Sequence, residues 1–214
     1  MKSNLGLDKF SLKYMNGSGK IPEFYVLDSK YISTTFTASP EGIRPYDQTD
    51  FPDDLKLLIG IYDEFDFPII FRQSDGKVLR DFLDTGYPSL FLISERVKKL
   101  LEEHGFTGWQ TYPIELYDKK GNKIEGYYGF SVTGRCGKID WSKSVKEKGK
   151  AIYTYKGLYF DVNEWDGSDF CIPDNYYAII VTKPVAEVLK KNKITNIKLT
   201  PTKEHEHYDY RELT

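Results

Sequence analysis

Two stretches of the chain match each other at a constant separation of 88 residues, and no other feature of the sequence restricts the fold as much. Residues 90–97 (LFLISERV) align with residues 178–185 (AIIVTKPV), which places Ser94 opposite Thr182. Each stretch has the pattern of a buried strand, a hydroxyl residue that caps a helix, about ten helical residues, and then a loop and a second extended stretch. The pattern predicts one strand-helix-strand unit used twice.

The two units span about residues 86–117 and about residues 174–201. Val97 and Val185 hold equivalent places in them, each with a leucine four residues later, so both helices should dock one apolar face on a sheet. If the units are copies, both valines are buried. Chance similarity of two amphipathic segments is the alternative, because short periodic patterns recur easily.

The sequence between the units is rich in strand patterns. Residues 114–117 and 123–130 flank a glycine-containing loop, and residues 153–155 are followed by residues 158–162 across Lys156-Gly157. Both arrangements are typical of antiparallel hairpins. Hairpins that interrupt strand-helix units favour an α+β fold over a strictly alternating parallel one.

The expected organisation is a single α+β domain over residues 21–201, with a polar N-terminal segment at 1–20 and a polar C-terminal tail at 202–214. Hydrophobic residues make up 40% of the 214 residues, which is enough to form a core and argues against disorder. Apolar runs fall short of the ~20 residues that cross a bilayer. The formal net charge of −2 gives no electrostatic footprint for nucleic acid.

Acidic residues gather between positions 50 and 66, with aromatic residues among them and Lys56 as the only cation. Such a segment has the character of a negatively charged, aromatic surface for a basic partner. The candidate partner-binding residues are Asp53, Asp54, Tyr62, Asp63, Glu64, Phe65 and Asp66. The structural alternative is that the first acids begin a helix after Asp50 and the later ones form a turn.

The residues that most often carry catalysis or bind metals are sparse. His104 sits at the end of the first predicted helix, where it suits a capping role. His205 and His207 lie in the predicted polar tail without a third ligand, so no metal site is expected. Cys136 has cations beside it but no base paired with it. We assign no catalytic residue, no metal and no cofactor, since phosphate-binding glycine loops are also missing.

Cys136 and Cys171 are too few for a disulfide framework, and free thiols fit a reducing compartment. The start of the chain, residues 1–13, is charged and lacks the apolar stretch of a signal peptide. We therefore expect a cytoplasmic protein.

Several short motifs resemble one known family. They are Ser94-Glu-Arg-Val, Gly105-Phe-Thr-Gly-Trp109, Ile139-Asp-Trp-Ser-Lys-Ser144, Tyr177-Ala-Ile-Ile-Val-Thr182 and Ile194-Thr-Asn-Ile197. The chain resembles the α+β family of bacterial immunity proteins that are encoded beside polymorphic toxins, a family long described only as a domain of unknown function. The resemblance covers about residues 86–201, with a weaker start at Phe24-Tyr-Val-Leu27, and departs from the pattern at Asn196, where the first unit has Gly108.

The resemblance implies a non-enzymatic protein that binds and neutralises a cognate toxin, and it carries over no catalytic residue. Two other readings remain open. One is an enzyme of unrecognised type that uses Cys136 or the pair His205 and His207, and the other is a generic protein-binding adaptor. A pocket of converging titratable groups would favour the enzyme, whereas an exposed patch without such a pocket would favour a binding protein.

Overall fold

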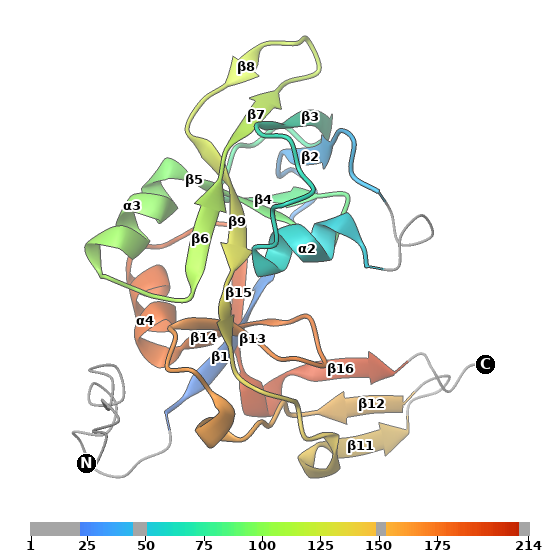
Figure 1. Cartoon of the computed structure of the whole chain (residues 1–214), viewed down its shortest axis with the longest axis vertical. Coiled ribbons are helices and arrows are strands. Elements are labelled where there is room, and N and C mark those ends of the chain that lie inside the picture. The colour runs from blue at the N-terminus through green and yellow to red at the C-terminus, as the bar shows by residue number, and fades with distance from the viewer. Residues whose placement is uncertain (1–21, 45–50, 149–152, 210–214) are drawn as a thin grey trace, which may run out of the picture.

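The computed structural model describes residues 22–44, 51–148 and 153–209 (Figure 1). The polar segment expected at 1–20 and the expected helix start at Asp50 lie outside these residues. Within them the chain forms three sheets and three α-helices, which confirms a mixed α+β fold. The helices are α2 (Asp53–Ile59), α3 (Glu95–Glu103) and α4 (Lys183–Lys191).

The sheets lie along the long axis of the molecule, with the β7–β8 hairpin at one end and the smallest sheet at the other (Figure 1). The eight-stranded sheet has the order β6 (Trp109–Tyr112), β9 (Tyr127–Val132), β5 (Phe91–Ser94), β4 (Phe82–Thr85), β2 (Thr37–Pro40), β3 (Ile69–Asp75), β7 (Ile114–Tyr117) and β8 (Lys123–Ile124). The five-stranded sheet has the order β10 (Gly134–Arg135), β13 (Phe170–Ile172), β14 (Ile179–Thr182), β1 (Phe24–Ser29) and β15 (Ile197–Pro201). The three-stranded sheet has the order β11 (Val145–Lys148), β12 (Tyr153–Lys156) and β16 (Glu206–Asp209). Short 3₁₀ helices form at η2 (Trp141–Lys143), η3 (Val162–Glu164) and η4 (Thr202–Glu204).

Both helices of the matching units form at the predicted places. α3 starts after Ser94, whose side chain accepts a hydrogen bond from the Val97 amide, and α4 starts after Thr182. The Thr182 hydroxyl donates instead to the Asp169 carboxylate at 3.1 Å. Val97 and Val185 are both fully buried, so each helix docks its apolar face on a sheet, and α3 and α4 lie one above the other in Figure 1.

Of the hairpin predicted from residues 114–117 and 123–130, the part up to Ile124 is confirmed, whereas residues 127–130 belong to β9, which pairs with β5 and β6 instead. β7 and β8 pair antiparallel with Leu116 opposite Ile124, and the turn is held by Asp118, whose carboxylate accepts hydrogen bonds from the amides of Lys120 and Asn122 at 2.8 Å each. Local turn chemistry of this kind is readable from sequence because donor and acceptor are only a few residues apart.

The second predicted hairpin is wrong. β12 pairs with β11 and with β16, while Leu158, expected in the returning strand, is buried and donates its amide to the Thr202 carbonyl. Residues 206–209, placed in the expected polar tail, form β16, with His207 opposite Tyr155. β16 packs here through His207, whose ring contacts the rings of Trp141 and Tyr176. The polar composition of residues 206–209 did not indicate this contact.

β1 lies between β14 and β15 in the five-stranded sheet, so both its neighbours come from much later in the chain. Tyr25 lies opposite Val181 of β14 on one side, and Leu27 lies opposite Leu199 of β15 on the other. These pairings join β1 to strands that lie between residues 179 and 201.

Two carboxylates tie the matching units to each other. Asp81 precedes β4 and accepts hydrogen bonds from the amide and the hydroxyl of Thr195, at 2.9 and 2.8 Å. Asp169 precedes β13 and accepts from the amide and the hydroxyl of Thr107, at 3.1 and 3.3 Å. A residue just before each unit thus supplies an acceptor to the loop of the other unit.

Candidate partner-binding surface

The acidic segment lies on α2 and the turn that follows it, between the two larger sheets. Leu57 and Leu58 are both fully buried, but they enter different hydrophobic clusters, one within the eight-stranded sheet and one shared with α3 and α4. Gly60 ends the helix with φ of 81°, a conformation that suits glycine, so it is the stop of α2 rather than a weak point inside it.

Asp53 is a structural carboxylate. Asp53 is only 3% exposed. The Arg44 guanidinium forms a bidentate contact with its carboxylate, with Nη2 2.7 Å from Oδ1 and Nε 3.0 Å from Oδ2, and Lys56 Nζ lies 3.7 Å from Oδ1. Burial raises the pKa of Asp53, but the hydrogen bonds and charge of Arg44, together with Lys56, outweigh burial and place the pKa below its usual value. The Asp53 side chain is therefore not available for direct contact with a partner.

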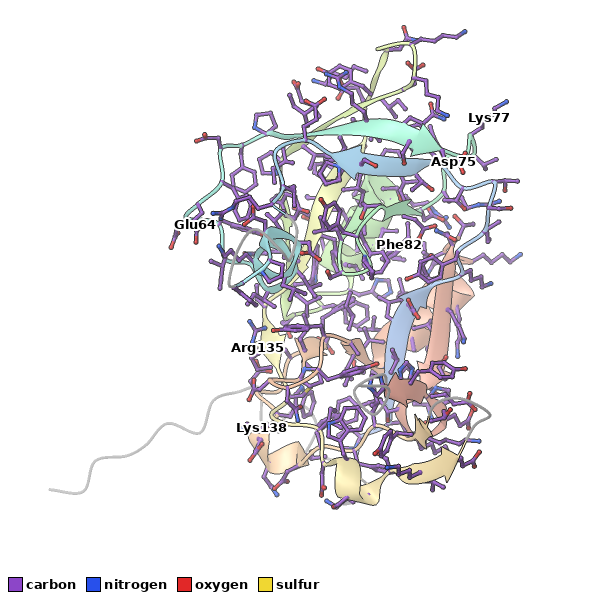
Figure 2. All side chains as sticks on the ribbon, turned by 90° about the vertical axis from the view of Figure 1, so that its right-hand side faces the viewer. Glu64, Asp75, Lys77, Phe82, Arg135 and Lys138 are labelled. Atoms are coloured by element: carbon purple, nitrogen blue, oxygen red, sulfur yellow. The ribbon has the colours of Figure 1, made fainter. Side chains whose placement is uncertain are left out.

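Glu64 completes the same ion-pair network from the turn. Its carboxylate lies 2.9 Å from Lys56 Nζ and 2.7 Å from Arg44 Nη2, and these hydrogen bonds keep the pKa of Glu64 below its usual value. Two cations therefore offset Asp53 and Glu64. Glu64 is still at the surface, at the left margin of Figure 2.

The other predicted residues divide between interior and surface. Asp54 is buried and accepts a hydrogen bond from the Ser89 hydroxyl. Tyr62 is half-buried and donates its hydroxyl to Ser131 Oγ at 2.8 Å, and Phe65 is half-buried against Phe67. Burial raises the pKa of Tyr62. The exposed members of the predicted set are Asp63, Glu64 and Asp66.

Two grooves flank the start of α2. The first, here the acidic groove, has a volume of about 450 Å³. Its lining residues are Glu41, Gly42, Ile43, Arg44, Asp53, Glu64, Phe65, Asp66, Pro68, Ile69 and Ile70. Four carboxylates and Arg44 line this groove, and three of the carboxylates already pair with cations, Asp53 and Glu64 with Arg44 and Glu41 with Arg72.

The second, here the tyrosine groove, has a volume of about 390 Å³. Its lining residues are Pro52, Asp54, Leu55, Tyr87, Pro88, Ser89 and Tyr177. Tyr177 is 51% exposed, and a neighbouring cavity that shares Pro88, Ser89 and Tyr177 is also lined by Tyr31, which is 61% exposed. Exposed tyrosines around a concave apolar surface are typical of protein recognition. The sequence shows abundant tyrosine but not that these come together, because they lie in three separate loops.

The two cysteines are not placed for catalysis. Cys136 and Cys171 are both fully buried, and burial, followed by the hydrogen bond and charge of Cys136, raises the pKa of Cys171 well above its usual value. A thiol that stays protonated is a poor nucleophile.

The histidines hold structure together. His207 Nδ1 and His205 Nε2 lie 3.0 and 3.4 Å from the Tyr176 hydroxyl, which links β16 to the loop before β14. Burial, with the charges of His207 and Lys198, lowers the pKa of His205 to about 4. His104 caps α3, as predicted, with its ring nitrogen 2.9 Å from the Leu100 carbonyl.

No three histidine, cysteine, aspartate or glutamate side chains of the described chain come together as a metal site. Over the same residues, no helix is both long and apolar enough to cross a membrane.

The chain was compared with known proteins. The model of one family, described as Immunity protein family (Imm11), matches residues 13–204. This match covers both strand-helix-strand units, α2 and both grooves. A search of the curated proteins found no match.

Proposed function

We propose that this chain, which belongs to the immunity protein family Imm11, neutralises a cognate bacterial toxin by binding it directly and without catalysis. The observation that carries the proposal is the family match over residues 13–204. An immunity protein acts on a toxin partner, and the full burial of Cys136 and the contacts of His205 and His207 with Tyr176 support binding rather than a reaction. The proposal places this interaction in the cytoplasm of a bacterium that encodes the toxin beside it.

The tyrosine groove is the proposed anchor of the interface. Interface hot spots are rich in tyrosine and lie in concave, well-packed pockets, and Tyr177 and Tyr87 offer two such rings beside Leu55. On the other side of α2, Asp63 and Asp66 supply negative charge that would speed the approach of a basic toxin surface, while the charge of Glu64 beside them is offset by Arg44 and Lys56. Asp53 and Asp54 hold α2 in place beneath these groups.

The proposal is tested by titrating the purified full-length chain with the toxin domain encoded by the adjacent gene. A neutralising complex should have nanomolar or lower Kd, about −12 kcal/mol or stronger. Tyr177→Ala should weaken it by about tenfold or more, because an exposed ring at the centre of an interface is lost. Tyr208→Ala, which removes an exposed tyrosine of the three-stranded sheet, is the matched control and should change Kd by about twofold or less. Failure of the wild-type chain to bind the toxin would contradict the proposal.

We also propose that the two strand-helix-strand units are copies of one unit. β5, α3 and β6 begin 88 residues before β14, α4 and β15, respectively. The third strand beside them also corresponds: Phe91 of β5 lies opposite Phe130 of β9, and Ile179 of β14 lies opposite Leu27 of β1. β9 follows the first unit in the chain, whereas β1 precedes the second. The order of strands is thus permuted between the proposed copies.

A further inference from the structure

A groove away from α2 has the opposite charge. This basic groove has a volume of about 610 Å³. Its lining residues are Lys30, Ile32, Arg80, Lys190, Lys193, Ile194, Thr195, Asn196, Ile197, Lys198 and Leu199. Five of these side chains are cationic and none is a carboxylate. Asp28, the cross-strand partner of Lys198, offsets part of that one charge, so the groove as a whole is positive.

The basic groove runs along the edge strand of the five-stranded sheet. In the described chain, β15 has β1 as its neighbour on one side and no strand on the other, and the two strands lie on the right of Figure 2, across the molecule from Glu64. Ile197 and Leu199 pack toward α4, while Lys198 points to the other face of the sheet. Cations therefore approach this edge from both faces, with Lys190 and Lys193 on the α4 side.

The outward backbone groups of this edge can be identified. The Lys30 amide donates to the Asn196 carbonyl, so Lys30 and Asn196 form a hydrogen-bonded pair of the antiparallel ladder. Pairs of this kind alternate along the strand, which directs the Lys198 backbone to β1 and the backbone groups of Ile197 and Leu199 outward. Pro201 fits the same alternation, because proline is tolerated where the missing N–H would face away from the sheet.

The corresponding edge of the other large sheet has no such charge. β6 is also an edge strand, and the positions 88 residues before Lys190, Lys193 and Lys198 hold Glu102, Gly105 and Gln110. The edge strands β6 and β15 are built in a similar way, but only the edge at β15 has the positive charge that would select an acidic ligand. Lysines near an exposed edge also discourage unwanted strand pairing, so a direct test must separate the two roles.

We infer that the β15 edge binds an extended acidic segment of the toxin, which adds to the sheet as a further strand and places its carboxylates against Lys190, Lys193 and Lys198. This inference rests on the proposed function and adds a second contact with the same partner. Strand addition uses the outward Leu199 amide and carbonyl for affinity and the flanking side chains for specificity. A nucleic acid is a weaker match, since it cannot form a strand ladder and the whole chain is slightly acidic, with a formal net charge of −2.

The experiment compares three full-length proteins in calorimetric titrations with the toxin domain of the adjacent gene. They are the wild-type chain, the groove variant Lys190→Glu/Lys193→Glu/Lys198→Glu, and the control variant Lys119→Glu/Lys120→Glu/Lys138→Glu. Both variants have the same net charge, and the control lysines are exposed and lie away from β15. Thermal melting checks that each variant is folded, and amide hydrogen exchange follows Leu199 with and without toxin.

We expect the groove variant to bind the toxin about 100-fold more weakly than wild type, with a change of about threefold or less for the control. The Leu199 amide should exchange slowly only in the complex. Equal affinities of the two variants, or an unprotected Leu199 amide, would overturn the inference while leaving the proposed function intact, and the lysines would then serve only to protect the edge. Groove-dependent binding of a single-stranded DNA oligonucleotide, with toxin affinity unchanged, would overturn it in favour of nucleic acid. If wild type does not bind the toxin, the proposed function itself fails and the inference fails with it.

Discussion

At the level of single residues, Asp53 depends on two neighbours, Arg44 and Lys56. The carboxylate has little solvent around it, and the guanidinium of Arg44 supplies both paired hydrogen bonds and charge. Because hydrogen bonds to charged groups are strong only while the charge is present, the contribution of Asp53 to stability depends on its ionisation.

Asp53→Asn should lower the free energy of unfolding by about 1.5–3 kcal/mol at neutral pH, since it removes the charge that Arg44 and Lys56 surround. The folded-state pKa of Asp53 lies below its ordinary value of 3.8, so this contribution is complete above pH 3.8 and is lost as pH falls through the folded-state pKa. Urea unfolding of both proteins at pH 7 and pH 3 measures the effect. A difference that stays constant between the two pH values would show that the charge of Asp53 is not its cause.

His205 makes the stability of the fold depend on pH, because its pKa differs between the folded and the unfolded chain. Its pKa is lowered from 6.5 to about 4 by burial, then by His207 and Lys198, so the folded chain favours the neutral ring. The contribution of neutral His205 to the free energy of unfolding is therefore complete above pH 6.5 and is lost as pH falls toward 4. His205→Gln, which cannot titrate, should show a smaller loss of melting temperature between pH 7 and pH 4.5 than wild type. Parallel losses in the two proteins would exclude His205 as the source.

At the level of elements, α3 and α4 each pack through a buried leucine, and the two leucines lie 88 residues apart in sequence. Leu101 and Leu189 are both fully buried. Leu101→Ala and Leu189→Ala should each lower the free energy of unfolding by about 2–5 kcal/mol, because each leaves a cavity in a shared hydrophobic cluster. Denaturant unfolding measures the free energy of unfolding of both variants. Lys99→Ala, on the exposed side of α3, is the control and should change this free energy by about 0.5 kcal/mol or less. A small cost for either leucine would contradict equivalent core positions.

Asp81 and Asp169 give the sharper test of two copies. If the units correspond, Asp81→Asn and Asp169→Asn should have similar costs, about 1.5–3 kcal/mol each, because each breaks hydrogen bonds to a threonine of the other unit. The unfolding free energies of the two single variants and the double variant would be compared. Costs that differ by more than about 2 kcal/mol would argue against equivalent roles.

Which elements could be predicted follows from how far apart their partners lie in sequence. α3, α4 and the β7–β8 hairpin depend on spacing and turn residues within a few positions, so the sequence contained their signals. β1 could not be placed, because Tyr25 and Leu27 find their partners more than 150 residues later, at Val181 and Leu199. β16 was missed for the same reason, since its partner strand and Tyr176 are far from it in the chain.

The candidate partner-binding residues divide between surface and interior, which the sequence did not indicate. Asp63, Glu64 and Asp66 lie at the surface, whereas Asp53 and Asp54 are buried. The contact of Arg44 with Asp53 depends on how the preceding loop folds. The tyrosine groove and the basic groove each combine residues from distant segments. The binding role was therefore expected from the family resemblance, and residue types alone did not indicate the surfaces that would bind.

At the level of the whole molecule, the chain belongs to an immunity protein family and has two grooves beside α2 and a cationic sheet edge. Together these surfaces would let the protein contact its partner on more than one side. The acidic and basic grooves lie on different sides of the fold, so a single toxin would contact both only through an extended interface. Such an interface fits tight neutralisation, because charges of both signs select against wrong partners.

The most direct measurement is survival of bacteria that express the toxin domain of the adjacent gene, with and without this chain. The account predicts growth with the wild-type chain and with Tyr208→Ala, and death without the chain. It also predicts reduced protection by Tyr177→Ala expressed at the same soluble level. Death of cells that contain the soluble wild-type chain, or survival of cells that lack it, would contradict the claim that this protein neutralises that toxin.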